Sequence, residues 1–122
     1  MNFHIVIAII KSEMTEKVIK VGKSVGAPGA TVIPARGTGT KEAKTFFGIN
    51  LDISRDVILF IVEERLIQTI QKEISQCCSL DNPGTGVTFS LPIANVIGLS
   101  NQIPHIEELI AKQLNREPYE TD

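Results

Sequence analysis

Two short segments of the chain are apolar on both of the faces that a β-strand presents. They are residues 3–10, which read FHIVIAII, and residues 56–62, which read DVILFIV. Successive side chains of a strand point to opposite faces, so a strand that is apolar on both faces has to be covered on both sides. The two segments are therefore predicted to be the central strands of one sheet.

Apolar residues at helical spacing follow each of these strands. Ser12 is a predicted N-cap of the first helix. The apolar stripe of the first helix is Met14, Val18, Val21 and Val25, and that of the second helix is Leu66, Ile67, Ile70, Ile74 and Cys77. A third helix is predicted over about residues 104–115, because Pro104 suits a first helical turn. The last seven residues are predicted to be frayed.

Two shorter strands, at residues 31–33 and 87–91, complete the pattern. They lead into Pro34 and Pro92, which cannot donate a hydrogen bond to a neighbouring strand, so both are predicted to be edge strands. The order β-α-β-β-α-β predicts a ferredoxin-like α+β sandwich, a four-stranded antiparallel sheet with two helices on one face. Right-handed crossovers place the first and third strands in the middle.

Two helices cover only one face of such a sheet, and this leaves an apolar face open. Val57, Leu59 and Ile61, with the matching row of the first strand, would be exposed there. Full burial of one aliphatic side chain contributes about 1.5–3 kcal/mol, so a cover for this face is strongly favoured. The third helix could cover part of the face, but a partner subunit is the more economical cover. We therefore expect a homo-oligomer.

The overall composition is that of one globular domain over residues 1–122. Apolar residues make up 43% and charged residues 21%, which excludes wholesale disorder. The net charge of −2 offers no general attraction to nucleic acid or to an anionic membrane. No apolar run is long enough to span a bilayer, and the N-terminus lacks the pattern of a signal peptide. A cytoplasmic location is therefore expected.

Neither a metal site nor a catalytic site is predicted. His4 and His105 are far apart in the sequence, and the adjacent Cys77 and Cys78 give no metal-ligand spacing and no disulfide framework. The two cysteines are predicted to be helix residues with at least one sulfur packed into the core. No nucleophile with a plausible base is visible, so we do not expect an enzyme.

Two glycine-containing segments are the best candidates for ligand contact. They consist of Gly37, Thr38, Gly39, Thr40 and Lys41, and of Gly84, Thr85 and Gly86. Glycines let a backbone approach a phosphate closely, exposed amides and threonine hydroxyls donate to it, and Lys41 adds a positive charge. A flexible exit from a strand and a simple turn are the alternative interpretations.

A long connection, residues 37–55, separates the second strand from the third. A connection of this length inside a compact domain is usually functional or disordered. Phe46 and Phe47 would be exposed in it unless something buries them, which favours docking on a partner protein. Folding back over the sheet or over the third helix is an equal alternative.

The order of elements and two sequence motifs resemble the PII signalling family. The motifs read GATVIPARGTG at residues 29–39 and NPGTGVTFSLPIANVIGL at residues 82–99. The resemblance implies a trimer that binds an adenine nucleotide in clefts between subunits, where the two glycine segments face each other. It also implies that Thr31 donates to the adenine edge, although threonine at the start of a strand is commonly just a β-former. Arg36 would pair with phosphate across the interface, with solvation of an edge strand as an equal alternative. A loop at residues 40–52 would dock on a transporter or an enzyme.

Several positions depart from the family pattern. Lys41 stands where the family has a loop glutamine that holds magnesium and 2-oxoglutarate, and Val87 stands where it has a phosphate-binding lysine. Residues 95–101 contain no arginine or lysine, and the only tyrosine, Tyr119, lies in the tail. These departures predict a divergent PII-like regulator, with nitrogen metabolism as the pathway that the family implies. The alternative is a CutA-like trimer that binds metal or is purely structural.

Overall fold

The computed structural model describes residues 1–37, 45–46, 49–50 and 53–120, with the side chains of residues 1–36 and 54–113. The strands of its main sheet are β1 (Phe3–Lys11), β2 (Thr31–Gly37), β5 (Ile53–Glu63) and β6 (Gly86–Pro92). A separate short pair consists of β3 (Thr45–Phe46) and β4 (Ile49–Asn50). The helices are α1 (Thr15–Val25), α2 (Ile67–Cys78) and α3 (Ile103–Glu120), and the single 3-10 turns are η1 (Ser12–Met14) and η3 (Glu64–Leu66).

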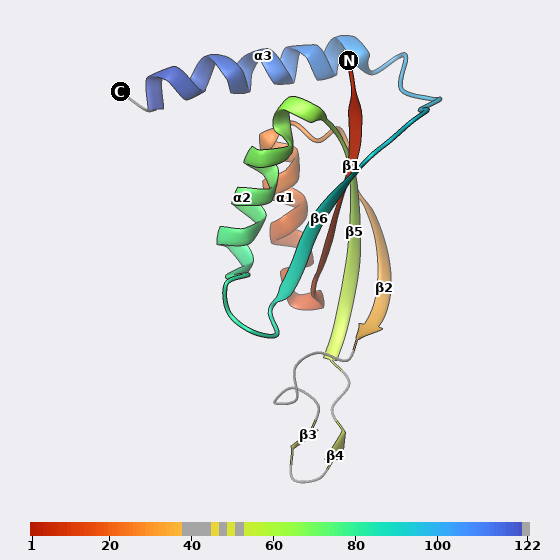
Figure 1. Cartoon of the computed structure of the whole chain (residues 1–122), viewed down its shortest axis with the longest axis vertical. Coiled ribbons are helices and arrows are strands. Elements are labelled where there is room, and N and C mark those ends of the chain that lie inside the picture. The colour runs from red at the N-terminus through yellow and green to blue at the C-terminus, as the bar shows by residue number, and fades with distance from the viewer. Residues whose placement is uncertain (38–44, 47–48, 51–52, 121–122) are drawn as a thin grey trace.

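The four long strands form one antiparallel sheet in the order β2-β5-β1-β6. The two strands that are apolar on both faces therefore take the central positions, and the register pairs Ile7 with Leu59. Pro34 and Pro92 lie in the edge strands β2 and β6, as predicted. Both α1 and α2 pack on the same face of the sheet (Figure 1). The predicted ferredoxin-like α+β fold is confirmed.

The hydrophobic core lies between this face and the two helices. Its largest side chain, Phe60 of β5, is completely buried. Alternate residues of the central strands enter the core beside apolar residues of the helices, and the set includes Val6, Ala8 and Ile10, Ile58, Phe60 and Val62, Val18 of α1, and Ile70 and Ile74 of α2. The even-numbered residues of β1 and β5 therefore face the helices, and the odd-numbered residues face away from them.

The opposite face of the sheet, which we call the open face, is a second apolar surface. Its central rows are half-buried, whereas Val87, Phe89 and Leu91 of β6 are 48%, 39% and 51% exposed. The register places these three side chains directly beside the row of β1. The open face comprises Ile5, Ile7 and Ile9 of β1, Ile33 of β2, Val57, Leu59 and Ile61 of β5, and Val87, Phe89 and Leu91 of β6.

The third helix does not cover the open face. Ile106 and Ile110 of α3 are buried in the core cluster on the helical side of the sheet. Gln113 Nε2 donates to the carbonyl oxygen of Ser24, near the end of α1, over 2.9 Å. Figure 1 shows α3 lying across the end of the helical layer. The helix runs from Ile103 to Glu120, and so extends over residues that were predicted to be frayed.

Two local predictions were wrong near the start of β5. Ser12 does not cap a helix; its Oγ lies 2.9 Å from Ser54 Oγ and donates to Asp56 Oδ1 over 3.2 Å. Thr15 Oγ1 donates to the other oxygen of Asp56. A carboxylate is a stronger hydrogen-bond acceptor than a neutral group, so the hydroxyls of Ser12 and Thr15 donate to Asp56 of β5. The strand also begins at Ile53 rather than at Asp56, which shortens the preceding connection.

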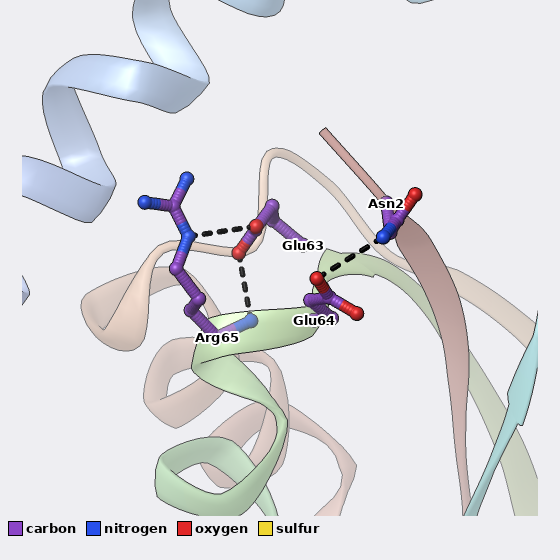
Figure 2. A network of polar contacts seen from close by, with 4 residues as sticks. All are labelled: Asn2, Glu63, Glu64 and Arg65. Atoms are coloured by element: carbon purple, nitrogen blue, oxygen red, sulfur yellow. Dashed lines mark hydrogen bonds and ion pairs between the residues drawn. The ribbon is translucent and has the colours of Figure 1, made fainter.

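Polar contacts fix the other end of β5, where the chain enters α2 (Figure 2). Glu63 is 3% exposed, and its Oε2 accepts a hydrogen bond from the Arg65 amide over 2.7 Å. Its Oε1 pairs with Arg65 Nε at 2.8 Å. Asn2 Nδ2 donates to Glu64 Oε1 over 3.1 Å, and the Glu64 amide donates to the Asn2 carbonyl over 2.9 Å. The N-terminus is therefore tied to this end of the sheet.

The adjacent cysteines differ in burial. Cys78 is 7% exposed, whereas Cys77 is half-buried and packs at the margin of the core. The prediction that at least one sulfur packs into the core is confirmed. Burial, followed by the neighbouring Cys77, raises the pKa of the Cys78 thiol to about 11.

This difference predicts unequal alkylation of the two thiols. Only the thiolate reacts, and a thiol with a pKa of about 11 is about one-thousandth ionised at pH 8. We expect iodoacetamide at pH 8 to modify Cys77 at least about tenfold faster than Cys78, and the rate at Cys78 to rise about tenfold per pH unit up to pH 10. Peptide mass spectrometry would measure both rates, with Cys77→Ser and Cys78→Ser as matched variants. Equal rates would contradict the burial of Cys78.

Candidate functional site

The described parts of both glycine segments lie at one end of the sheet. Gly37 is the last residue of β2 and pairs with Ile53, whereas Gly86 is the first residue of β6 and pairs with Ile10. This end is opposite to the end that carries the chain termini (Figure 1). Since β5 and β1 lie between β2 and β6, Gly37 and Gly86 are separated across the sheet by three strand spacings, or roughly 14 Å. One chain therefore does not bring the two segments together.

Several predicted site residues cannot be placed in this geometry. Thr38, Gly39, Thr40, Lys41 and Phe47 lie outside the described residues. Phe46 belongs to the short strand β3, which pairs with β4, but its side chain is not among those described. The expectations for these residues stay predictions.

The two predicted contacts on β2 are both exposed but lie at different ends of the strand. Thr31 begins β2 opposite Leu59, and Arg36 lies opposite Ser54 near its end. The two residues are five steps apart along the strand, which corresponds to roughly 16 Å. Pro34, Ala35, Arg36 and Ser54 line a hollow of about 630 Å³. Arg36 therefore lies in a concave part of the surface at the same end of the sheet as the glycine segments.

The 84–86 turn has a backbone that requires glycine. Gly84 has a φ of 77° and Gly86 a φ of 144°, in the region that residues with a Cβ rarely adopt. A Cβ on Gly86 would lie 2.4 Å from the carbonyl oxygen of Ile9, so β1 also leaves no room for a side chain. Thr85 Oγ1 donates to the carbonyl oxygens of Asn82, over 2.8 Å, and Ser79, over 3.0 Å. Its single proton is used within the turn, which leaves the backbone amide as the donor for a ligand.

Arg55 is a residue that the sequence analysis missed. Its side chain is on β5 and 6% exposed, and its Nη2 donates to the Gly84 carbonyl over 2.9 Å. The register places Lys11 of β1 directly beside Arg55, so the guanidinium passes the end of β1 to reach the turn before β6. The alternation of side chains along a strand could have identified it. Val57 and Leu59 lie on one face of β5, and continuing that every-second-residue pattern by one position towards the N-terminus reaches Arg55. The prediction had assigned this residue to a loop.

The start of β5 is held from both sides of the sheet. Ser54 and Asp56 contact the hydroxyls that precede and begin α1, whereas Arg55 contacts the turn at Gly84. Successive side chains point to opposite faces of a strand, so three adjacent residues fix the strand against two different elements. The described end of the long connection is therefore mechanically linked to the 84–86 turn.

The described side chains contain no group of three His, Cys, Asp or Glu residues that could hold a metal ion. In the part of the chain that the structure describes, none of the helices has both the length and the apolar character needed to cross a membrane.

Comparison with known proteins gave matches in sequence family and in fold. The family model for nitrogen regulatory protein P-II matches residues 3–102. A crystal structure from Thermus thermophilus, of a protein described as PII-like in signalling, is similar with a TM-score of 0.57 and 18% sequence identity. That similarity covers 76% of this chain and 88% of the other, and at this identity it establishes the fold. No curated protein matches the sequence.

The constraint at Gly86 predicts a specific loss of stability. Gly86→Ala places a Cβ against the Ile9 carbonyl in a strained backbone conformation, whereas Gly98→Ala at a φ of 109° meets no atom within 4 Å. We expect Gly86→Ala to lower the free energy of unfolding by about 2–4 kcal/mol, and Gly98→Ala to lower it by only about 1 kcal/mol. Urea denaturation would measure both values. Equal losses would show that the contact with β1 is unimportant.

Proposed function

The chain belongs to the nitrogen regulatory protein P-II family, and we propose that it is a homotrimeric sensor of an adenine nucleotide that regulates a partner enzyme or transporter. The single observation that supports this most is the open face, an apolar surface that spans all four strands beside the candidate ligand site. The described elements do not cover it, and a copy of the same chain offers a matching apolar surface.

Assembly through the open face also accounts for the position of the glycine segments. Within one chain they lie at opposite edges of the sheet, Gly37 on β2 and Gly86 on β6. A threefold arrangement places the β2 edge of one subunit beside the β6 edge of the next. The segments would then face each other across a cleft between subunits, which is the arrangement that the family resemblance implies.

The proposed effector is anionic because of the donors at this end of the sheet. Arg36 lines the hollow beside β2. In the 84–86 turn the Thr85 hydroxyl already donates to carbonyl oxygens of the turn, so the backbone N–H groups are the donors that would contact a ligand. Phosphate groups are bound well by such combinations of cation and backbone amide. In this proposal Thr31 contacts the adenine edge, and Gly37, Thr38, Gly39, Thr40 and Lys41 complete the phosphate site.

Regulation would follow from the loop at residues 40–52. A ligand that binds better to one loop conformation shifts the population toward it. Phe46 and Phe47 are the side chains we propose to dock on the target protein. A role of the regulator in nitrogen metabolism and a cytoplasmic location are further parts of the proposal, and the protein itself would carry out no catalysis.

Nucleotide binding should appear as thermal stabilisation. A ligand that binds only the folded protein at 100 times its Kd adds about 2.7 kcal/mol to the stability, so we expect the Tm to rise by several degrees with at least one of AMP, ADP, ATP or a cyclic nucleotide. Scans with and without magnesium, 2-oxoglutarate and copper would be run in parallel. Arg36→Gln should reduce the shift, whereas Lys72→Gln, at an exposed position of α2, should not.

No shift with any nucleotide would contradict the proposed effector. A shift with copper alone would favour the CutA-like alternative.

If the open face is the subunit interface, a charged substitution on it should change the oligomeric state. The trimer would have a mass of about 40 kDa, three times the 13.3 kDa of the chain. Leu91→Glu would bury a carboxylate in the interface, and we expect it to convert the trimer to monomer. Val32→Glu is the matched control, because Val32 is 38% exposed but pairs with Ile58 on the helical side. Size-exclusion chromatography with light scattering measures both masses, and a monomeric wild type would contradict the proposed assembly.

A further inference from the structure

We propose that Pro34 is the positioning residue of the boundary between two subunits. The β6 edge of one copy pairs through its main chain with the start of β2 on the next copy, and Pro34 ends that ladder, so that the space at the ligand end stays open. The inference rests on the proposed trimer. It assigns a role to a residue that lies in neither glycine segment.

The first argument is the direction of the main-chain groups on β2. In an antiparallel pair, alternate residues bond to the partner strand, and the residues between them point their N–H and C=O groups away from it. Pro34 lies opposite Asp56 within the ladder of β2 and β5, but it has no N–H group. Its nitrogen therefore faces the outer edge of the sheet. The N–H group of Val32, two residues earlier, faces the same way.

The second argument is the same alternation on β6. The Ile93 amide donates to the Phe3 carbonyl oxygen over 3.0 Å, so the odd-numbered residues here bond to β1. Thr88 and Ser90 therefore point their N–H groups to the outer edge. Among the described residues, no main-chain acceptor from outside the sheet bonds to these groups or to the Val32 amide. Both edges thus carry donors that another strand could satisfy.

The third argument is that the two edges are unequally protected. Natural edge strands commonly carry a proline or a charge that prevents pairing with another chain. Residues 86–91 of β6 contain neither. On β2, Pro34 blocks the middle of the strand, and only the exposed residues 31–33 precede it. The β6 edge can therefore accept a strand over most of its length, whereas β2 can offer one only at its start.

The fourth argument is the register, which makes a second copy the matching partner. The strand order leaves β2 antiparallel to β6, so copies repeated about a threefold axis meet as an antiparallel pair. The register across the sheet places Val32 at the height of Thr88, and Pro34 at the height of Gly86. With the copies at equal height, Val32 and Thr88 exchange two hydrogen bonds. The next outward pair, Pro34 and Gly86, lacks a donor.

The end of this ladder coincides with the start of the hollow on β2. Pro34 lines the hollow of about 630 Å³, and Arg36 follows it toward the ligand end. A ladder that continued past Pro34 would pull Arg36 and Gly37 against the 84–86 turn of the next copy. Pro34 therefore separates a bonded part of the boundary, which holds the subunits together, from an open part, which admits the ligand.

Amide hydrogen exchange of the full-length trimer, followed by NMR, tests the ladder in the wild type. A bonded amide exchanges only after its bond opens, so we expect the Val32 and Thr88 amides to exchange at least about tenfold more slowly than the Ser90 amide. Ser90 points outward as well, but it lies at the height of Ala30, before β2 begins. A trimer in which all three amides exchange equally fast would overturn the proposal.

Pro34→Val tests the role of the proline, because valine suits a strand and restores the N–H group. Each of the three boundaries gains a hydrogen bond, so we expect subunit exchange between labelled trimers to slow at least about tenfold. We expect the affinity for AMP, ADP or ATP, whichever binds the wild type most tightly, to fall at least about threefold. Pro92→Val is the matched control, since it makes the same change on the outer edge of β6 beyond the start of β2, and it should alter neither quantity.

A merely structural role for Pro34 would change the Tm and leave the subunit exchange rate and the nucleotide affinity as they are in the wild type. That result would overturn the proposal, as would equal effects of Pro34→Val and Pro92→Val.

The two proposals fail in different ways. Protected Val32 and Thr88 amides in a trimer that binds no nucleotide would overturn the nucleotide sensor and support the ladder. A trimer that binds a nucleotide but leaves these amides unprotected would overturn the ladder alone. A monomeric wild type would overturn both.

Discussion

The antiparallel pairing of β1 with β5 is the interaction on which the other layers depend. Both strands are apolar on both faces, so their pairing creates two hydrophobic surfaces from one sheet. The helices α1 and α2 cover the first surface and form the core with it. The second surface, the open face, stays uncovered within the described chain. Burial of apolar surface stabilises the fold on the first face, and the same effect would favour a cover on the second.

The candidate site lies where these central strands end. There the apolar side chains give way to Lys11, Arg55 and Asp56, and the contacts change from packing to hydrogen bonds with defined directions. The strands fix these polar groups as rigidly as they fix the core residues beside them. Arg55 and Asp56 are adjacent, but their side chains point to opposite faces of the sheet. A displacement of the start of β5 would therefore alter hydrogen bonds both at the 84–86 turn and at the beginning of α1.

Periodicity and proline placement in the sequence were enough to predict the central strands, the edge strands and the open face. Pro34 and Pro92 identify edges because the missing N–H is a local property of the residue. The partners of individual polar groups were not predictable in the same way. Ser12 and Asp56, or Arg55 and Gly84, are separated by dozens of residues, and they meet only because of the strand register. A shift of register by one residue would move each side chain to the other face.

The position of the chain termini has a practical consequence. The N-terminus lies at the end of the sheet that is remote from the candidate site, and α3 lies across the same end of the molecule (Figure 1). The nine residues of β1 span roughly 30 Å between the two ends. Asn2 is tied to Glu64, and Gln113 of α3 is tied to Ser24, so the start of β1 and the first part of α3 are held at this end. A fluorescent protein or an affinity tag fused before β1 would therefore leave the ligand end unobstructed, and this geometry suits the fold to a genetically encoded reporter.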